Sequence, residues 1–264
     1  GSSSLNRGET GNLNFTKLEH LVRELCDMRN RGMDVCLVSS GAIAVGRQTI
    51  GLNERPKDIS TKQACAAVGQ ARLMMTYQRM FAEYNQIAGQ ILMTKNTMVN
   101  PVSRANAKNT FDELFHLGVI PVVNENDTVS TYEMQFGDND TLSAIVASIS
   151  DADLLIILSD IDGLYDADPR THENVRIVHE VPEFTRSLFS MAGGSGTARG
   201  TGGMYTKLQA AEICVRSGID MIVAKSDEPE ILYRLVEGEQ LGTLFYAENV
   251  HPQLKKRDII IGTA

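Results

Sequence analysis

The sequence predicts an α/β protein, built on a mostly parallel sheet with helices on both faces. Apolar runs of strand length alternate along the 264-residue chain with stretches of helical period. Hydrophobic residues make up 42% of the chain and charged residues 22%, which are globular values and exclude a disordered or fibrous protein. The apolar runs are far shorter than the roughly 20 residues that cross a bilayer, so no membrane association is expected.

The first half of the chain is expected to begin with a helix. Thr16-x-x-Glu19 has the form of a capping box, and apolar residues follow it at helical spacing until Gly32. Strands are expected near 35–38, 89–93 and 119–123, and further helices after the 39–42 turn, from Ser60-x-x-Gln63, and over 104–117. One face of the helix that starts at Ser60 is apolar, formed by Ala64, Ala67, Val68, Ala71 and Met75.

The second half continues the alternation with longer polar connections. Residues 128–136 have the partial alternation of a β-hairpin, 159–176 are rich in Asp, Gly and Pro, and 192–203 form a glycine-rich loop. The expected helices are 141–150, 204–217 and 229–236, and the expected strands are 154–158, 221–224, 242–246 and 258–261.

Charge and cysteine usage narrow the class of protein. With 25 basic and 33 acidic residues the net charge is −8, which argues against a nucleic-acid partner. An acidic protein can still bind an anion through backbone N–H groups and a few lysines. The four cysteines show no CxxC spacing, so we expect buried, reduced thiols in a cytoplasmic protein.

Ligands of parallel α/β sheets bind beyond the carboxyl ends of the strands, so the polar segments that follow strands are the candidate site. Residues 39–41, 124–127 and 159–160 follow predicted strands. Residues 1–4 open the chain, and the glycine-rich loop leads through 201–207 into a helix.

The glycine-rich loop and Lys207 form the candidate phosphate site. A loop that opens a helix presents free N–H groups to an anion, and a lysine one turn into that helix can add charge at a phosphoryl group. The alternative is a surface loop with a solvated lysine. The segment has neither the GxxxxGK[ST] order of a P-loop nor the GxGxxG of a dinucleotide fold.

Asp138-Asn139-Asp140 precedes a helix, and two interpretations stay open. One of these residues can serve as the helix cap. Together with Asp127, they can also bind an ammonium group or orient lysines. A nucleophilic role for Ser40 has little support, because no histidine lies near it in the sequence.

These segments together resemble the glutamate 5-kinase signature of the amino acid kinase family. The matching strings are Leu37–Ala44, Pro121–Asp127, Gly137–Asp140, Leu158–Tyr165 and Gly200–Lys207. They occur in the family's order and cover nearly the whole chain.

The resemblance implies a three-layer α/β/α sandwich that phosphorylates the L-glutamate side-chain carboxylate with ATP and Mg²⁺, the first step of proline biosynthesis. Ser40, Asp127 and Asn139 fall on glutamate-binding positions, and Lys207, Asp138 and Asp140 on catalytic ones. The implied ATP-binding residues are Ser2, Ser159, Asp160, Thr201, Gly202, Gly203, Met204, Tyr205, Thr206 and Lys207. No residue is assigned to a metal.

The resemblance also implies a single kinase domain over 1–264, feedback inhibition by proline, and a homo-oligomer. In the family, the first phosphate loop follows a central strand with a lysine two residues before its glycine. We therefore expect about ten residues, including that strand and lysine, upstream of Gly1. The PUA domain that follows the kinase domain in many members is absent from the sequence.

Two alternatives remain. The first is another kinase of the same family, acting on acetylglutamate, aspartate, carbamate or UMP; the 124–127 and 137–140 strings favour glutamate. The second is a non-catalytic amino-acid sensor on the same fold, supported by the missing upstream lysine.

Overall fold

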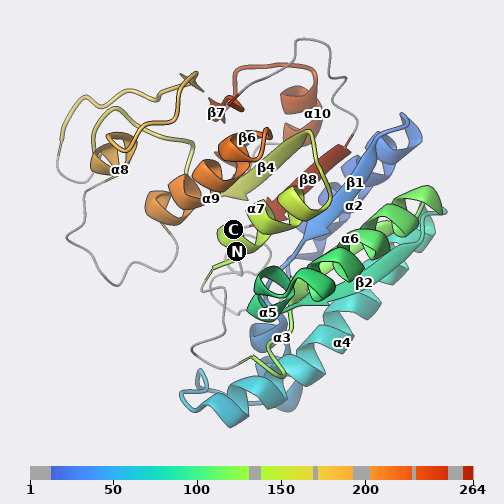
Figure 1. Cartoon of the computed structure of the whole chain (residues 1–264). Helices are drawn as coiled ribbons and strands as arrows, with labels where there is room; N and C mark the ends of the chain where they lie inside the picture. The colour runs from blue at the N-terminus through green and yellow to red at the C-terminus, as the bar shows by residue number, and fades with distance from the viewer. Residues whose placement is uncertain are drawn as a thin grey trace. The chain divides into compact units, whose positions relative to one another are not determined.

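The computed structural model divides the chain into two compact units, residues 1–136 and 137–262. It describes residues 13–130, 138–168, 172–192, 203–227 and 230–248, together with the backbone of 258–263. Figure 1 labels many of the helices and strands of each unit.

The first unit contains a parallel sheet in the order β2-β3-β1. The strands are β1 (Asp34–Val38), β2 (Ala88–Met93) and β3 (Ile120–Glu125). The apolar runs of β1 and β3 are almost wholly buried, as expected of inner parallel strands. The helices are α2 (Phe15–Asn30), α3 (Ala42–Ile50), α4 (Ile59–Glu83), α5 (Lys95–Val99) and α6 (Pro101–His116).

Two predicted helix starts are wrong by one or two residues, for the same reason. Asn14 caps α2 by accepting a hydrogen bond from the Lys17 N–H at 3.2 Å, so the capping box predicted at Thr16 does not form. The cap of α4 is Asp58, and Ser60 already lies inside the helix. A carboxylate or amide just upstream replaces the hydroxyl because it is an equally strong or stronger cap.

The apolar stripe of α4 faces outward. Val68 is 38% exposed and Met75 51%, whereas Leu73 and Tyr77 on the opposite side are buried. The buried side of α4 is itself mostly apolar, and it also carries Gly69, where α4 approaches α3. A Cβ atom at Gly69 would lie 1.7 Å from a backbone oxygen of α3, so the two helices pack backbone against backbone. A search for apolar residues overlooks a contact made by glycine.

The second unit has a mixed sheet in the order β8-β4-β6-β7-β5. β4 (Leu154–Ser159) and β6 (Asp220–Lys225) are parallel, β7 (Thr243–Phe245) is antiparallel to β6, and β5 (Glu180–Val181) is parallel to β7. β8 spans Asp258–Thr263. The helices are α7 (Asn139–Ile149), α8 (Leu188–Met191), α9 (Met204–Arg216) and α10 (Ile231–Val236).

Helices α7 and α9 pack against each other and over β4 and β6, as Figure 1 shows. This packing places the starts of the two helices close to the carboxyl end of β4. The predicted strands and long helices are confirmed in both units, whereas the short α5, β5 and α8 were not predicted.

Some expectations lie outside the described residues, namely most of the 128–136 hairpin and of the 192–203 loop. The four cysteines are free and buried, as predicted. Among the helices that the structure describes, none combines the length and the apolar character needed to span a bilayer.

Candidate active site

In the first unit, the turn between β1 and α3 carries the predicted substrate residue Ser40. Ser39 is fully buried and donates its backbone N–H to the Val123 carbonyl at 2.9 Å, so the turn starts in register with β3. Gly41 ends the turn at φ +99°, a left-handed conformation that favours glycine. The Ser40 Oγ is buried and has no hydrogen-bond partner.

A chain of side-chain amides runs from the buried Asn124 of β3 through the buried Gln70 of α4 to the exposed Gln90 of β2. The Asn124 side-chain amide donates to Gln70 Oε1 at 2.9 Å, and Gln70 in turn donates to Gln90 Oε1 at 3.0 Å. Asn124 Oδ1 accepts the Glu125 N–H at 2.8 Å. Sequence reasoning missed Gln70, although a glutamine within the small, apolar run 64–71 was a visible signal.

Asp127 follows these amides, and burial raises the pKa of its carboxyl from 3.8 to about 6. Desolvation is the cause of this shift, and it disfavours the ionised form. A cationic group of a ligand would therefore stabilise ionised Asp127 more than it would an already compensated carboxylate.

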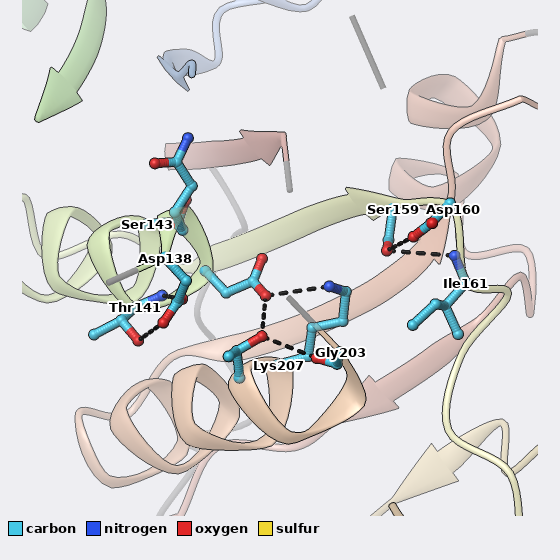
Figure 2. Close-up of polar contacts among 11 residues, drawn as sticks. Asp138, Thr141, Ser143, Ser159, Asp160, Ile161, Gly203 and Lys207 are labelled. Carbon is cyan, nitrogen blue, oxygen red and sulfur yellow. Dashed lines mark hydrogen bonds and ion pairs between the residues drawn. The ribbon is translucent and has the colours of Figure 1, made fainter. Parts of the chain in front are cut away.

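In the second unit, Asp138 is the cap of α7, which confirms one of the two interpretations of the 138–140 string. Its carboxylate accepts the Thr141 N–H at 2.7 Å and the Thr141 hydroxyl at 3.1 Å, as Figure 2 shows. Burial raises the pKa of Asp138, and the bonds from Thr141 oppose that shift.

The charged centre of the second unit is a buried ion pair between Lys207 and Asp140. Lys207 Nζ lies 3.1 Å from Asp140 Oδ2, and the side chains are 2% and 3% exposed. Thr206 donates its hydroxyl to the same carboxylate oxygen at 2.7 Å. Asp140, in the first turn of α7, therefore holds the ammonium group of Lys207 from α9 in place.

Three of the predicted residues also carry unpaired polar atoms. Among the residues that the structure describes, the buried side-chain atoms without a hydrogen-bond partner are Ser40 Oγ, Asn139 Nδ2 and Asp140 Oδ1. Buried polar atoms are nearly always paired in folded proteins, and leaving one unpaired costs about 1–3 kcal/mol. Unpaired atoms at predicted ligand-binding positions are typical of groups whose partner is a ligand.

The predicted nucleotide residues lie at two places in the second unit. At the end of β4, the buried Ser159 donates to Asp160 Oδ1 at 3.1 Å and accepts the Ile161 N–H at 3.3 Å (Figure 2). Gly203 directly precedes α9, and among the described residues no side chain caps this helix. Its first N–H groups are thus available to an anion.

Only some of the remaining predicted nucleotide-binding residues lie within the described part of the chain. Met204 and Tyr205 open α9, and the Tyr205 ring, 46% exposed, lies 5.2 Å from that of Phe189. Ser2, Thr201 and Gly202 lie outside the described residues.

Lys225 is a charged residue of this edge that sequence reasoning missed. It is paired in register with Ser159, and its Nζ lies 3.2 Å from Asp162 Oδ1, which raises the pKa of the lysine. The rule that sites follow strand ends could have found it, because it comes directly after the predicted strand 221–224. In the described part of the chain, no three His, Cys, Asp or Glu side chains form a metal-binding group.

Comparison with known proteins decides the family. The amino acid kinase family profile matches residues 1–225. The glutamate 5-kinase of Carboxydothermus hydrogenoformans is 51% identical over 262 residues, which are 99% of this chain and 70% of that protein. The glutamate 5-kinase of Clostridium tetani is 50% identical over 94% of this chain and 92% of its own length. The chain belongs to the glutamate 5-kinases of the amino acid kinase family.

The fold is also that of the amino acid kinases. The crystal structure of UMP kinase from Bacillus anthracis superposes with a TM-score of 0.61, covering 95% of this chain and 96% of the other at 15% identity. The predicted amino acid kinase fold and family are thereby confirmed. The glutamate 5-kinase relatives, at about 50% identity, bear on the substrate of this chain, whereas the UMP kinase structure, at 15% identity, shows only the fold.

Proposed function

We propose that this glutamate 5-kinase transfers the γ-phosphoryl group of ATP to the side-chain carboxylate of L-glutamate, giving γ-glutamyl phosphate and ADP. The observation that carries the proposal is that Ser40, Asn139 and Asp140 each have a buried polar atom without a hydrogen-bond partner. The family signature assigns the first two residues to the substrate and Asp140 to the catalytic group. The relatives at about 50% identity support the same substrate.

The chemistry requires positive charge more than it requires a base. A carboxylate is already a nucleophile, so no proton must be removed before it attacks phosphorus. The protein has to overcome repulsion between two anions and hold them in line. A buried lysine and the free N–H groups of a helix start meet that need, and none of the five histidines occurs in the matching strings.

We assign the substrate's amino-acid end to Ser40, Asp127 and Asn139. The carboxyl of Asp127 is desolvated, so its ionised form gains from the α-ammonium group of glutamate. Ser40 Oγ in the first unit and Asn139 Nδ2 in the second are hydrogen-bonding groups of the kind that bind carboxylates.

Lys207 is assigned to the transferring phosphoryl group, and Asp140 holds it there. The shared Asp140 oxygen, which also accepts the Thr206 hydroxyl, fixes the lysine in one orientation before substrates bind. A charge that is already in place acts on the transition state without a reorganisation cost. The start of α9, with Gly203 to Tyr205, is assigned to the phosphates, and Ser159 and Asp160 to the nucleoside.

Mg²⁺ is proposed to accompany ATP. The residues fit the ion, because Mg²⁺ usually takes one or two protein carboxylates together with substrate phosphates, and Asp140 Oδ1 has no other partner. When bound, the ion neutralises charge on the β- and γ-phosphate oxygens. Asp140 would hold it through that oxygen while its other oxygen keeps Lys207 in place.

A hydroxamate assay tests the proposal. Hydroxylamine converts an acyl phosphate to a hydroxamate, so the expected result is colour that requires both ATP and L-glutamate. Acetylglutamate, aspartate and carbamate are the comparison substrates in this assay, whereas UMP is compared by ADP release, because its product UDP is not an acyl phosphate. Acetylglutamate is the sharpest of these, because it keeps the side-chain carboxylate but lacks the ammonium group assigned to Asp127. Turnover with another acceptor and none with glutamate would overturn the assignment.

Proline is proposed as a feedback inhibitor that shares the glutamate site. It carries the same α-carboxylate and a charged amine, which suit Asp127 and its neighbours. We expect inhibition that saturating glutamate relieves. Inhibition that no glutamate concentration relieves would place proline elsewhere.

Location and assembly complete the proposal. Four free, buried cysteines favour a reducing compartment, so we propose a cytoplasmic enzyme. We further propose that residues 1–264 form one kinase domain that assembles as a homo-oligomer. Light scattering behind a sizing column measures the assembly, and a monomer mass at micromolar concentration contradicts it.

A further inference from the structure

Tyr77 is a buried tyrosine of α4 whose position packing alone does not explain. Its side chain is fully buried, and its ring lies 6.4 Å from that of Phe81 in the same helix. A phenylalanine would fill this space equally well. The hydroxyl group adds a buried polar atom that needs a partner, and its cost is recovered only where that partner is well placed.

That partner is Ser39, the first residue of the turn that carries Ser40. The Tyr77 and Ser39 hydroxyls are 2.8 Å apart, in a buried contact between residues 38 positions apart in the sequence. The backbone of Ser39 is bound on its other side to Val123 of β3 at 2.9 Å. The start of the turn is therefore fixed both to the sheet and to α4.

The same helix fixes the end of the turn. A Cβ atom at Gly69 of α4 would lie 1.7 Å from the carbonyl oxygen of Ala42, the first residue of α3. α4 thus contacts the turn on either side of Ser40 and Gly41, through Tyr77 before them and Gly69 after them. Ser40 has no side-chain partner of its own, so the orientation of its hydroxyl depends on this clamp.

We propose that Tyr77 is a positioning residue for glutamate binding: through Ser39 it holds the 39–41 turn so that the Ser40 hydroxyl faces the substrate. This inference rests on the proposed function, in which Ser40 binds glutamate. Tyr77 does not itself contact the substrate, and its effect should be confined to glutamate.

The test is a double-mutant cycle on Tyr77→Phe and Ser39→Ala, with both Michaelis constants measured. One neutral hydrogen bond corresponds to about a three- to tenfold change, so each single variant should raise the glutamate KM by about that factor. The ATP KM and kcat should stay within about twofold. Because the two hydroxyls act as one unit, the double variant should show no further rise.

Tyr84→Phe is the matched control. Tyr84 follows the last residue of α4, and its hydroxyl donates to Glu19 Oε1 at 2.7 Å, so the substitution removes a partly buried tyrosine hydrogen bond, here to a carboxylate, at the end of the same helix. We expect an unchanged glutamate KM in this variant. Thermal unfolding of each variant shows whether it is folded at the assay temperature. If Tyr77→Phe is unfolded at that temperature, the kinetics of Ser39→Ala alone test the proposal.

The outcomes separate this inference from the function on which it rests. A wild-type enzyme without glutamate turnover overturns the proposed function and this inference with it. An active wild-type enzyme whose Tyr77→Phe and Ser39→Ala variants keep the normal glutamate KM overturns the positioning role alone. An equal rise in both Michaelis constants, or the same rise in Tyr84→Phe, shows a structural role and also overturns it.

Discussion

The candidate site residues of the two units are held in place by different kinds of interaction. In the first unit neutral groups hold the backbone: the Ser39–Tyr77 contact, the Asn124–Gln70 amides and the close approach at Gly69. Asp127, the acid of this unit, is left desolvated. In the second unit the charge is already paired, Lys207 with Asp140.

This difference matches the roles proposed for the two sets of residues, the binding of glutamate and the transfer of the phosphoryl group of ATP. When an ammonium group binds a buried carboxylate whose pKa is raised, the attraction between the charges offsets the cost of desolvating the carboxylate. This arrangement suits reversible binding of an amino acid. A lysine fixed in a buried pair contributes its charge at all times, which suits a phosphoryl group whose negative charge develops during transfer. The following predictions test whether binding and catalysis divide in this way.

The largest effect is expected for Lys207→Ala, which should lower kcat by about 10²–10³-fold, because it removes a charge that acts in the transition state. Lys108→Ala is the matched control: its Nζ also lies 3.1 Å from a carboxylate, that of Asp112, but this pair is exposed on α6. Hydroxamate formation by folded variants is the measurement. Near-normal turnover by Lys207→Ala would contradict the assignment.

The same substitution should also destabilise the fold, and a second variant separates the two effects. Leaving Asp140 buried without its lysine costs about 3–5 kcal/mol of unfolding free energy. The double variant Lys207→Met with Asp140→Asn removes that uncompensated charge. Compared with Lys207→Met alone, it should show recovered stability in urea unfolding while turnover stays low. Recovery of both would mean that the pair serves structure alone.

Asp127→Asn should raise the glutamate KM by about 10- to 100-fold with little change in the ATP KM, because hydrogen bonds to charged groups contribute about 1.5–3 kcal/mol. Asn139→Ala, in the second unit, should also act on glutamate, though less strongly, since its amide is neutral. Steady-state kinetics with each substrate varied in turn measure both effects. If the ATP KM rises equally, these residues support the fold and do not select the substrate.

The pH dependence of glutamate binding should follow Asp127. Its pKa is about 6 in the free protein, and glutamate pairs with the ionised form, so affinity is constant above pH 6 and falls below it, by up to tenfold per pH unit. The glutamate KM of Asp127→Asn should lack this dependence. A wild-type KM that stays flat from pH 7 to pH 5 would contradict the ammonium contact.

The contribution of Asp127 to the free energy of unfolding should change with pH in the opposite direction to its contribution to glutamate affinity. A carboxyl whose pKa rises on folding stabilises the fold while protonated, and this contribution is lost as pH rises from 3.8 through about 6. Asp127→Asn should therefore increase the unfolding free energy at pH 7 by about 1–3 kcal/mol, a gain that disappears below pH 4. Denaturant titrations at both pH values measure it.

The smallest effect compares two helix caps. Asp138 caps α7 and Asp58 caps α4 with nearly the same bonds, each to the N–H and a hydroxyl of the helix start. Replacing either with alanine should cost about 0.5–2 kcal/mol. If Asp138 also has the catalytic role that the family signature implies, only Asp138→Ala should lower turnover beyond its effect on stability. Equal turnover in the two variants would reduce Asp138 to a cap.

Local sequence determined most of the elements and named the candidate site residues. A buried strand and the polar residues that follow it are contiguous, so Val38 with Ser40, and Leu158 with Ser159, could be interpreted without any distant contact. The family strings named Asp140 and Lys207 for the same reason. Errors at helix starts came from equally local competitors, Asn14 and Asp58, which are caps at least as strong as the hydroxyls chosen.

Only the tertiary structure decided which groups meet. The Lys207–Asp140 pair joins residues 67 positions apart and the Ser39–Tyr77 contact joins residues 38 apart, and neither separation has a periodic signature. The outward stripe of α4 shows the physical reason. Periodicity reveals which side chains share a face, whereas the burial of that face depends on what packs against it. In α4 the face with Gly69, Leu73 and Tyr77 is buried, and the apolar stripe at Val68 and Met75 is exposed to solvent.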